Sequence, residues 1–242
     1  MGGRGSYSMS NGRTRAKIKL LGASSGVRAH NVGGPRDVRK DVSELAKMAG
    51  FAGALGTDSI GKQSMSSYMA AIGRLEKEYG ALKAVPTTVA GADGKGFHAA
   101  AATGPGGATL ILNRASMGNA ARHAGETARE SAAGFKMPTN GKLTSNARYT
   151  VTHEYGHLLQ NALYQKARKS GYNGSQRQFA AKAYRDISRT AAKKYGATGK
   201  SISKYGKTNA FEAFAESFAS LHSGAPTAYG KAMADYLRKN RL

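Results

Sequence analysis

The sequence HEYGH at residues 153–157 constrains the fold most, because the HExxH spacing acquires chemical meaning only on an α-helix. On a helix, residues four apart differ by about 40° in direction and about 6 Å along the axis, so two imidazoles can reach one cation. The flanking sequence favours such a helix. Val151, Leu158 and Leu159 supply an apolar side, and residues 147–169 contain no Pro.

This spacing makes His153 and His157 the predicted metal ligands, with Glu154 projecting to nearly the same side. Zn²⁺ suits such a site, because it takes three protein ligands and keeps a fourth position open for water. Glu154 would act as the general base that accepts the proton of this water and passes it to the leaving amine. A chance match in a helix that binds nothing is the alternative. Gly156 costs about 1 kcal/mol of helix propensity relative to Ala, but it would permit close packing beneath the metal.

Two candidates for a third ligand lie downstream. Glu212 and Glu216 stand four residues apart in NAFEAFAESFASLH, residues 209–222, beside a stripe of Phe side chains. The chain contains only eight Glu, and a carboxylate near a core needs a partner because burial of an unpaired charge is costly. A zinc ion would be such a partner, although two exposed glutamates on an amphipathic helix are the alternative. The spacing alone does not choose between the two carboxylates.

The composition limits the chemistry further. None of the 242 residues is Cys, which excludes disulfides, a Cys nucleophile and a thiolate metal site. Any metal must therefore bind to His, Asp, Glu or backbone oxygen. The basic N-terminus lacks the apolar region of a secretory signal, and no apolar run approaches the roughly 18 residues that span a bilayer. These features predict a soluble protein that is cytoplasmic, virion-associated or delivered into a host.

The charge balance is strongly basic. The chain has 37 Lys and Arg against 14 Asp and Glu, a formal net charge of +23. A field of this sign attracts nucleic acid and other polyanions, although a solvated basic surface that binds them only non-specifically is the simpler interpretation. No sequence signature of a nucleic-acid module is present. The predicted partners are a protein or peptide substrate and nucleic acid or other polyanions, bound non-specifically through the basic surface and the basic N-terminal segment of residues 1–36.

The N-terminal half divides into three segments. Residues 1–36 are rich in Gly, Ser and basic residues and predict a flexible basic arm. Residues 37–80 predict a helical lead-in, with one short helix in DVSELAKMAGFAGAL at 41–55 and a second whose apolar face carries Met65, Tyr68 and Ile72. Short apolar runs separated by Gly-rich turns predict a small sheet over 82–114.

The remaining chain is predicted to be mainly helical. Residues 115–135 leave helix and loop open, and residues 136–146 are expected to form a loop. Residues 145–242 contain four helical patterns and both parts of the metal site. We therefore expect an α+β domain over 37–242, mostly helical, with a small sheet preceding the HExxH helix.

Two segments resemble the anthrax lethal factor-like zinc peptidases, which include domains of phage proteins. These segments are HEYGH and SKYGKTNAFEAFAESFASLHS, and the likeness covers roughly residues 145–223. In this family the third zinc ligand follows, by seven residues, the Tyr of a Tyr-Gly-basic-Thr-Asn segment. The resemblance therefore implies that Glu212 completes the zinc site and that Tyr205 stabilises the oxyanion. It implies that Glu216 orients a zinc-bound His.

The resemblance also implies a zincin-like fold, in which the edge strand of a small sheet pairs with an extended substrate. The strand GATLILNRA is the candidate, with Leu110, Ile111 and Leu112 at the substrate. Four further histidines have no assigned role. His30, His98 and His123 are expected at the surface or in packing, whereas His222 follows the ExxxE helix and could reach the cleft.

Together these features predict a zinc endopeptidase of the gluzincin type. A hypothesis from another class is a basic phage virion or nucleic-acid-associated structural protein that retains an inactive or auxiliary zincin core. The net charge of +23 motivates this second hypothesis. The presence of all three ligands, the base and the Tyr argues against a decayed site, because a lapsed site need not retain all five positions.

Overall fold

The computed structural model of the chain describes residues 44–57, 60–94, 97–104, 107–135, 143–198 and 202–240. Within this part the chain is α+β, with many helices and one small mixed sheet, as the sequence predicts. The expected arm of residues 1–36, which includes His30, lies outside the described residues. None of the described helices combines the length and the apolar character needed to cross a bilayer.

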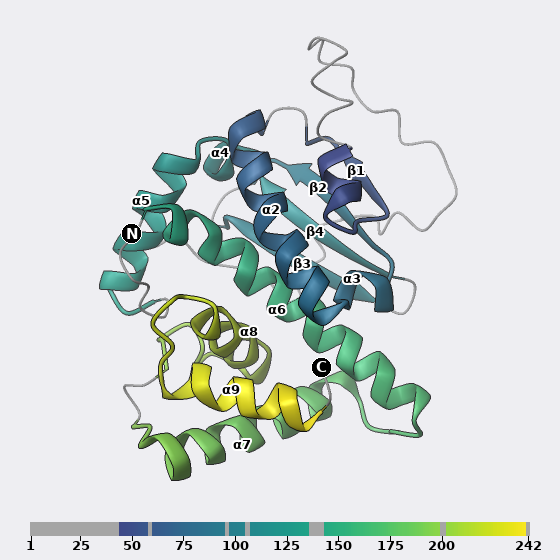
Figure 1. Cartoon of the computed structure of the whole chain (residues 1–242), viewed down its shortest axis with the longest axis vertical. Helices are drawn as coiled ribbons and strands as arrows, with labels where there is room; N and C mark the ends of the chain where they lie inside the picture. Colours follow the sequence, from purple (N-terminus) through teal and green to yellow (C-terminus); the bar gives the residue numbers. More distant parts are fainter. Residues whose placement is uncertain are drawn as a thin grey trace.

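The sheet has four strands in the order β1-β2-β4-β3 (Figure 1). These strands are β1 (Gly53–Leu55), β2 (Thr87–Ala92), β3 (Ala99–Gly104) and β4 (Gly107–Asn113). β1 and β4 run parallel to β2, whereas β3 runs antiparallel to β4. The last three strands fall inside the predicted sheet region of residues 82–114.

Strand β1 corrects the prediction of one helix over residues 41–55. Helical structure covers residues 44–48, and Gly50 then adopts a φ of 96°, which a helix cannot continue. Gly53–Leu55 instead pairs with Thr88–Ala90 of β2. The apolar residues at helical spacing therefore do not form one continuous helix, because the backbone of Gly53–Leu55 pairs with a distant strand.

The expectation that the GATLILNRA strand lies at a sheet edge was wrong. β4 pairs with β2 through residues 108–113 on one side and with β3 through residues 107–112 on the other, so its backbone groups are already used. Leu110 and Leu112 are fully buried in the sheet core, and Ile111 is half-buried. Among the described strands, β3 and β1 occupy the two edges.

Helix α2 (Lys62–Tyr79) confirms the predicted apolar face, because Met65, Tyr68 and Ile72 are all 0 % exposed. Two short helices flank the sheet, α3 (Ala81–Ala84) and α4 (Arg114–Met117). Residues 115–135, for which the sequence left helix and loop open, contain helix α5 (Ala120–Ala132). Most of the expected loop at residues 136–146 lies outside the described residues, and α6 begins at Leu143.

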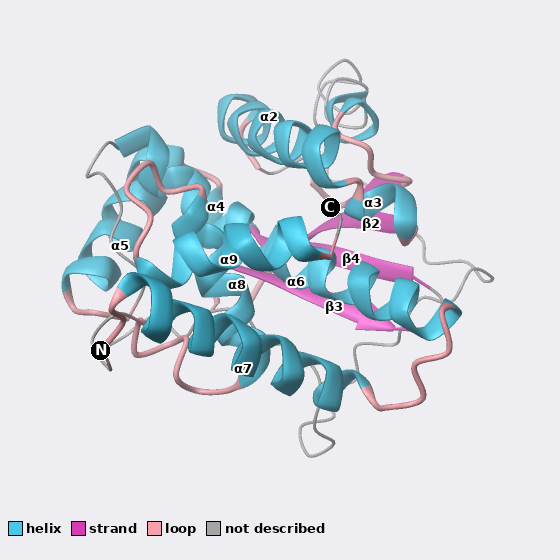
Figure 2. Ribbon diagram, turned by 60° about the horizontal axis from the view of Figure 1, so that its bottom comes forward, coloured by secondary structure: helices cyan, strands magenta, loops and turns pink. Residues whose placement is uncertain are grey.

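Four helices form the C-terminal part, as predicted. They are α6 (Leu143–Lys169), α7 (Gln176–Tyr195), α8 (Ala210–Leu221) and α9 (Ala228–Lys239). In Figure 1, α6 runs through the middle of the molecule, with the sheet and α2 on one side and α7, α8 and α9 on the other. Figure 2 shows the same helix alongside β3 and β4.

The middle of α6 is enclosed by these neighbours. Every residue from 149 to 163 is buried, including polar ones. Such a helix must find partners for its polar side chains inside the protein, because water does not reach them. The HExxH segment therefore lies in the core of the molecule.

Candidate metal centre

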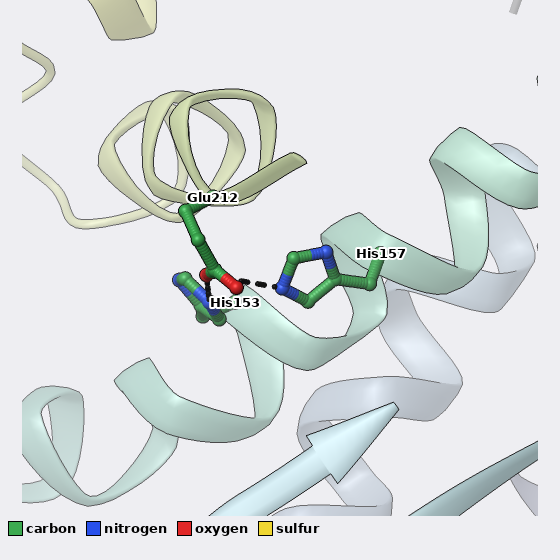
Figure 3. A group of neighbouring side chains, drawn as sticks. All are labelled: His153, His157 and Glu212. Carbon is green, nitrogen blue, oxygen red and sulfur yellow. Dashed lines mark hydrogen bonds and ion pairs between the residues drawn. The ribbon is translucent and has the colours of Figure 1, made fainter. Parts of the chain in front are cut away.

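The site is formed where α6 meets α8. His153 and His157 extend from α6 on the same side, and the carboxylate of Glu212 reaches them from the first turn of α8 (Figure 3). The Oε2 atom of Glu212 lies 3.1 Å from Nε2 of His153 and 3.3 Å from Nε2 of His157. All three residues are buried, and one ligand atom from each lies within 4.8 Å of the others.

Two local features bring α8 this close to α6. A Cβ atom at Gly156 would lie 3.0 Å from Cα of Ala215 and 3.3 Å from Cβ of Phe218, so a side chain there would separate the helices. The Asn209 side chain caps α8 by accepting hydrogen bonds from the backbone N–H groups of Phe211 and Glu212. This cap fixes the start of the helix and places Glu212, which contacts both imidazoles, in its first turn.

Glu216 contacts the opposite side of the His153 ring. Its Oε1 atom lies 2.8 Å from Nδ1 of His153, whereas Glu212 lies at Nε2. The carboxylate of Glu216 thus holds the Nδ1–H tautomer and leaves Nε2 directed at the centre of the group. The two glutamates that the spacing could not separate occupy different positions around one imidazole.

Two further residues hold Glu216 in place. The Tyr149 hydroxyl donates to Oε2 of Glu216 at 2.9 Å, and Ser203 Oγ donates to the same oxygen at 2.7 Å. Ser203 Oγ in turn accepts from the backbone N–H of Gly206. Sequence reasoning missed both residues. Tyr149 precedes His153 by four positions, a spacing that could have identified it, but nothing in the local pattern marks Ser203.

Charge pairing within the site shifts two pKa values in opposite directions. Burial alone lowers the pKa of His153, but hydrogen bonds to Glu212 and Glu216 and the nearby carboxylate charges outweigh burial and raise it. Burial alone raises the pKa of Glu212, but the charge of His157 and the hydrogen bonds to both histidines outweigh burial and lower it. In the metal-free protein the site is therefore an ion pair that a cation would replace.

Glu154 lies in the same core and has no hydrogen-bond partner among the described residues. It is 0 % exposed, and neither carboxylate oxygen makes a hydrogen bond. A buried carboxylate without a partner is costly and is rarely retained unless a ligand, a water molecule or a metal-bound group satisfies it. This side chain is one turn or less from both histidines on α6, so it can meet a proton donor held at the metal centre.

The ring of Tyr205 lies near that of His153. The two rings are 5.7 Å apart between centroids, and Tyr205 is half-buried in the turn that precedes α8. The Thr208 hydroxyl donates to the backbone carbonyl of Tyr205 at 2.7 Å and holds this turn. The structure therefore brings together the six residues that the sequence predicts for the site and its surroundings. They are His153, Glu154, His157, Tyr205, Glu212 and Glu216.

The other histidines lie elsewhere. His222 is exposed at the C-terminal end of α8, where its Nε2 atom is 3.1 Å from the Tyr79 hydroxyl. His98 and His123 are buried, and they contact Glu130 and Thr150 through hydrogen bonds of 3.1 Å. These contacts agree with a packing role for His98 and His123, and the structure does not place His222 at the metal centre.

Comparisons with models of protein families, with curated proteins and with solved structures find no match to this chain. What the site can do is therefore inferred from its own donors. Two imidazole nitrogens and one carboxylate oxygen are the donor set of a catalytic zinc site with an open position. Ligand atoms about 2 Å from a tetrahedral ion lie about 3.3 Å from one another, which matches the 3.1 Å and 3.3 Å separations seen here.

Proposed function

We propose that this protein is a zinc-dependent endopeptidase of the gluzincin type. The observation that carries the proposal is the convergence of His153, His157 and Glu212 beside the unpartnered carboxylate of Glu154. A structural zinc site is closed by a fourth protein ligand, whereas this group offers three ligands and an adjacent base. Metal-assisted hydrolysis requires these features, namely three protein ligands, an open position on the metal and an adjacent base.

A zinc ion held by these residues would polarise the scissile carbonyl and make water a better nucleophile near neutral pH. Glu154 accepts the proton of the attacking water and then donates it to the nitrogen of the leaving amine. Its burial suits this task, because the core holds the carboxylate in place and no described side chain competes for its oxygens. Tyr205 donates a hydrogen bond to the oxygen that becomes negatively charged in the transition state.

Glu216 acts on the reaction through His153. Through the 2.8 Å contact between its Oε1 and Nδ1 of His153, it favours one tautomer and one orientation of the imidazole, and the hydroxyls of Tyr149 and Ser203 keep the carboxylate itself in place. This network is buried, so its geometry is insulated from solvent exchange. We expect its loss to weaken metal binding before it affects proton transfer.

Strand β3 is the element to which an extended substrate could pair. It is bound to β4 on one side, and among the described strands it has no partner on the other. It also packs against α6, the helix that carries HExxH. A peptide added to this edge would offer its scissile bond to the helix side of the sheet, through backbone hydrogen bonds that do not depend on side-chain identity.

The test combines metal analysis with hydrolysis of a fluorescence-quenched peptide library. We expect one equivalent of zinc in the wild-type protein and in Glu154→Gln, with hydrolysis reduced at least 1,000-fold or about 4 kcal/mol in the variant. Glu212→Ala should lose both zinc and hydrolysis. Cleavage by Glu154→Gln at the wild-type rate, or protein that takes up no zinc after dialysis against it, would overturn the proposal.

The alternative of a basic virion or nucleic-acid-associated protein with an inactive core draws on the net charge of +23. It predicts that no peptide in the library is cleaved, although zinc could still bind. The same experiment therefore separates the two functions.

A further inference from the structure

A groove of about 400 Å³ lies between α7 and α9, outside the metal centre. Its lining comes from these two helices and from the residue that follows α9, and none of it belongs to the metal centre. α7 and α9 pack against each other and against α8, whereas the metal centre lies where α8 meets α6 (Figure 2). A ligand in this groove would therefore contact a separate surface.

The two helices that form the groove carry many more basic than acidic residues. Their 20 and 12 residues contain nine Lys or Arg and two Asp. Helix α2, with 18 residues, contains three Lys or Arg and two Glu. α7 and α9 are thus markedly more basic than α2.

The basic side chains of α7 form a row. Lys182, Arg185, Arg189 and Lys193 follow one another at intervals of three or four residues, so they share one face over about 16 Å of helix. All four are exposed. Lys182 and Arg189 also line the groove, and Lys239 lines it from α9.

The two acidic residues of the groove are already neutralised. Asp186 pairs with Lys182 at 3.4 Å, and Asp235 pairs with Lys194 at 2.8 Å and also with Arg238. Within the described part of the chain, Arg185, Arg189, Lys193 and Lys239 form no ion pair. Arg189 and Lys239 in the lining, together with Arg185 and Lys193 on the exposed face of α7, therefore remain available to an anionic partner.

We infer that the α7–α9 groove binds the phosphodiester backbone of nucleic acid. A linear polyanion fits a row of regularly spaced cations, and Arg side chains bind phosphate oxygens through two N–H groups at once. Phe179 and Tyr236 are half-buried in the lining and supply aromatic surface on which an unpaired base can stack. A flat anionic membrane would contact the rim of the groove without reaching these rings.

The test compares two variants of the full chain that lose the same charge. The groove variant is Arg185→Gln/Arg189→Gln/Lys193→Gln/Lys239→Gln. The control is Lys47→Gln/Arg74→Gln/Lys77→Gln/Lys83→Gln, whose four residues are exposed near and on α2 and α3. Both changes reduce the net charge from +23 to +19. The basic residues before position 44 are identical in both proteins, so a difference between them reports on the groove.

Binding of a fluorescein-labelled 30-nucleotide DNA strand is measured by anisotropy between 50 and 200 mM salt. We expect the groove variant to bind at least tenfold more weakly, with the slope of log affinity against log salt reduced by about 3. The control should lose less than threefold. A conservative variant, Arg185→Lys/Arg189→Lys, keeps the charge and should remain within threefold of wild type.

Equal losses in the groove variant and the control would overturn the inference, because net charge alone would then explain binding. Vesicles containing 30 % phosphatidylserine provide the second arm. If the groove variant weakens vesicle binding and leaves DNA binding unchanged, the partner is a membrane and the inference is also wrong. A far-UV circular dichroism spectrum and a urea midpoint at the wild-type level confirm that the variant is folded, and neither measurement depends on the proposed peptidase function.

Discussion

At the scale of single residues, His153 is the centre of the site. Glu212 lies at its Nε2 atom and Glu216 at its Nδ1 atom, and both carboxylates come from one face of α8. A neutral imidazole can give only one nitrogen to a metal, so the other nitrogen needs an acceptor that fixes the tautomer. The hydroxyls of Tyr149 and Ser203 extend this control one step further from the metal.

Replacement of Glu216 by Gln should weaken zinc binding by about 10- to 100-fold, because the amide holds the Nδ1–H of His153 less strongly and can present the wrong group to it. Competition with a chromogenic chelator measures this change. The exposed Glu78→Gln provides the matched control and should leave zinc affinity unchanged. A Glu216→Gln protein with wild-type affinity would show that this carboxylate does not act on the metal through His153.

The pH dependence of stability follows from the ion pair in the metal-free protein. The pKa of His153 is raised by folding, so its contribution is complete below the unfolded pKa of about 6.5 and is lost as pH rises towards the raised value. The pKa of Glu212 is lowered, so its contribution is complete above about 4.5 and is lost as pH falls below it.

In EDTA, the free energy of unfolding should therefore decrease from pH 6.5 to 9, by up to about 1.4 kcal/mol for each pH unit. Urea unfolding at a series of pH values measures it. Glu212→Gln removes the main partner of His153 and should flatten this decrease. An increase in unfolding free energy over the same range in the wild-type protein would contradict the assigned sign.

At the scale of elements, α6 is joined to its neighbours through the two central positions of HExxH. The Tyr155 hydroxyl donates to Oε2 of Glu76 at 2.9 Å and accepts from the backbone N–H of Ala81. Glu76 also accepts from the backbone N–H of Leu82, so α2, α3 and α6 share one buried polar network. On the opposite side of α6, the absence of a side chain at Gly156 allows α8 to pack closely against it.

Gly156→Ala should destabilise the protein by about 1–3 kcal/mol, although Ala has the better helix propensity. The added methyl would lie 3.0 Å from Cα of Ala215, so α8 must shift and carry Glu212 away from the histidines. We therefore expect zinc affinity to fall at least fivefold, measured together with unfolding in urea. Gly125→Ala in α5 is the control, because its nearest contact would be 3.9 Å away, and it should be neutral or stabilising.

At the scale of the whole molecule, the candidate metal centre lies between two parts of the fold. α6 packs against α2 and β3 on one side and against α8 on the other, and α8 in turn packs against α7 and α9. The ligands come from α6 and α8, which are connected through a long intervening segment that includes α7. A bound ion would therefore stabilise the contact between the C-terminal helices and the rest of the protein.

On the proposed function, removal of zinc should lower the melting temperature, because zinc would bind the folded protein in preference to the unfolded chain. At free zinc about 100 times the dissociation constant, the stabilisation is about 2.7 kcal/mol. Calorimetry with EDTA, followed by addition of Zn²⁺ or Mg²⁺, measures this effect. Recovery with Zn²⁺ alone is expected, whereas equal melting temperatures with and without zinc would contradict a metal site between α6 and α8.

Several features could be predicted from local sequence, and the reason is the period of the helix. The apolar face of α2 and the four C-terminal helices follow from residues three and four apart, which need no knowledge of distant partners. The same period placed His153, Glu154 and His157 on one side of α6 and identified Glu212 and Glu216 as neighbours. Their chemical roles remain predictions.

Tertiary structure decided what depends on pairing between distant segments. β1 exists because Gly53–Leu55 pairs with β2, and β4 lies inside the sheet because β3 turns back beside it. No local pattern states which strand will be covered, since an alternating strand can lie at an edge or in the middle. Ser203 entered the site for the same reason, because only the fold brings its hydroxyl to Glu216.

The sequence by itself determined that two imidazoles and a base share one helix face and that a carboxylate pair shares another, because helical geometry is set by residues within one turn. Only the tertiary structure decided that Glu212 meets the Nε2 atoms of both histidines while Glu216 meets Nδ1 of His153. His153 and Glu212 are separated by 59 positions, and their contact depends on the angle and distance at which α6 and α8 pack. Gly156 sets that distance, and its effect becomes visible only when both helices are in place.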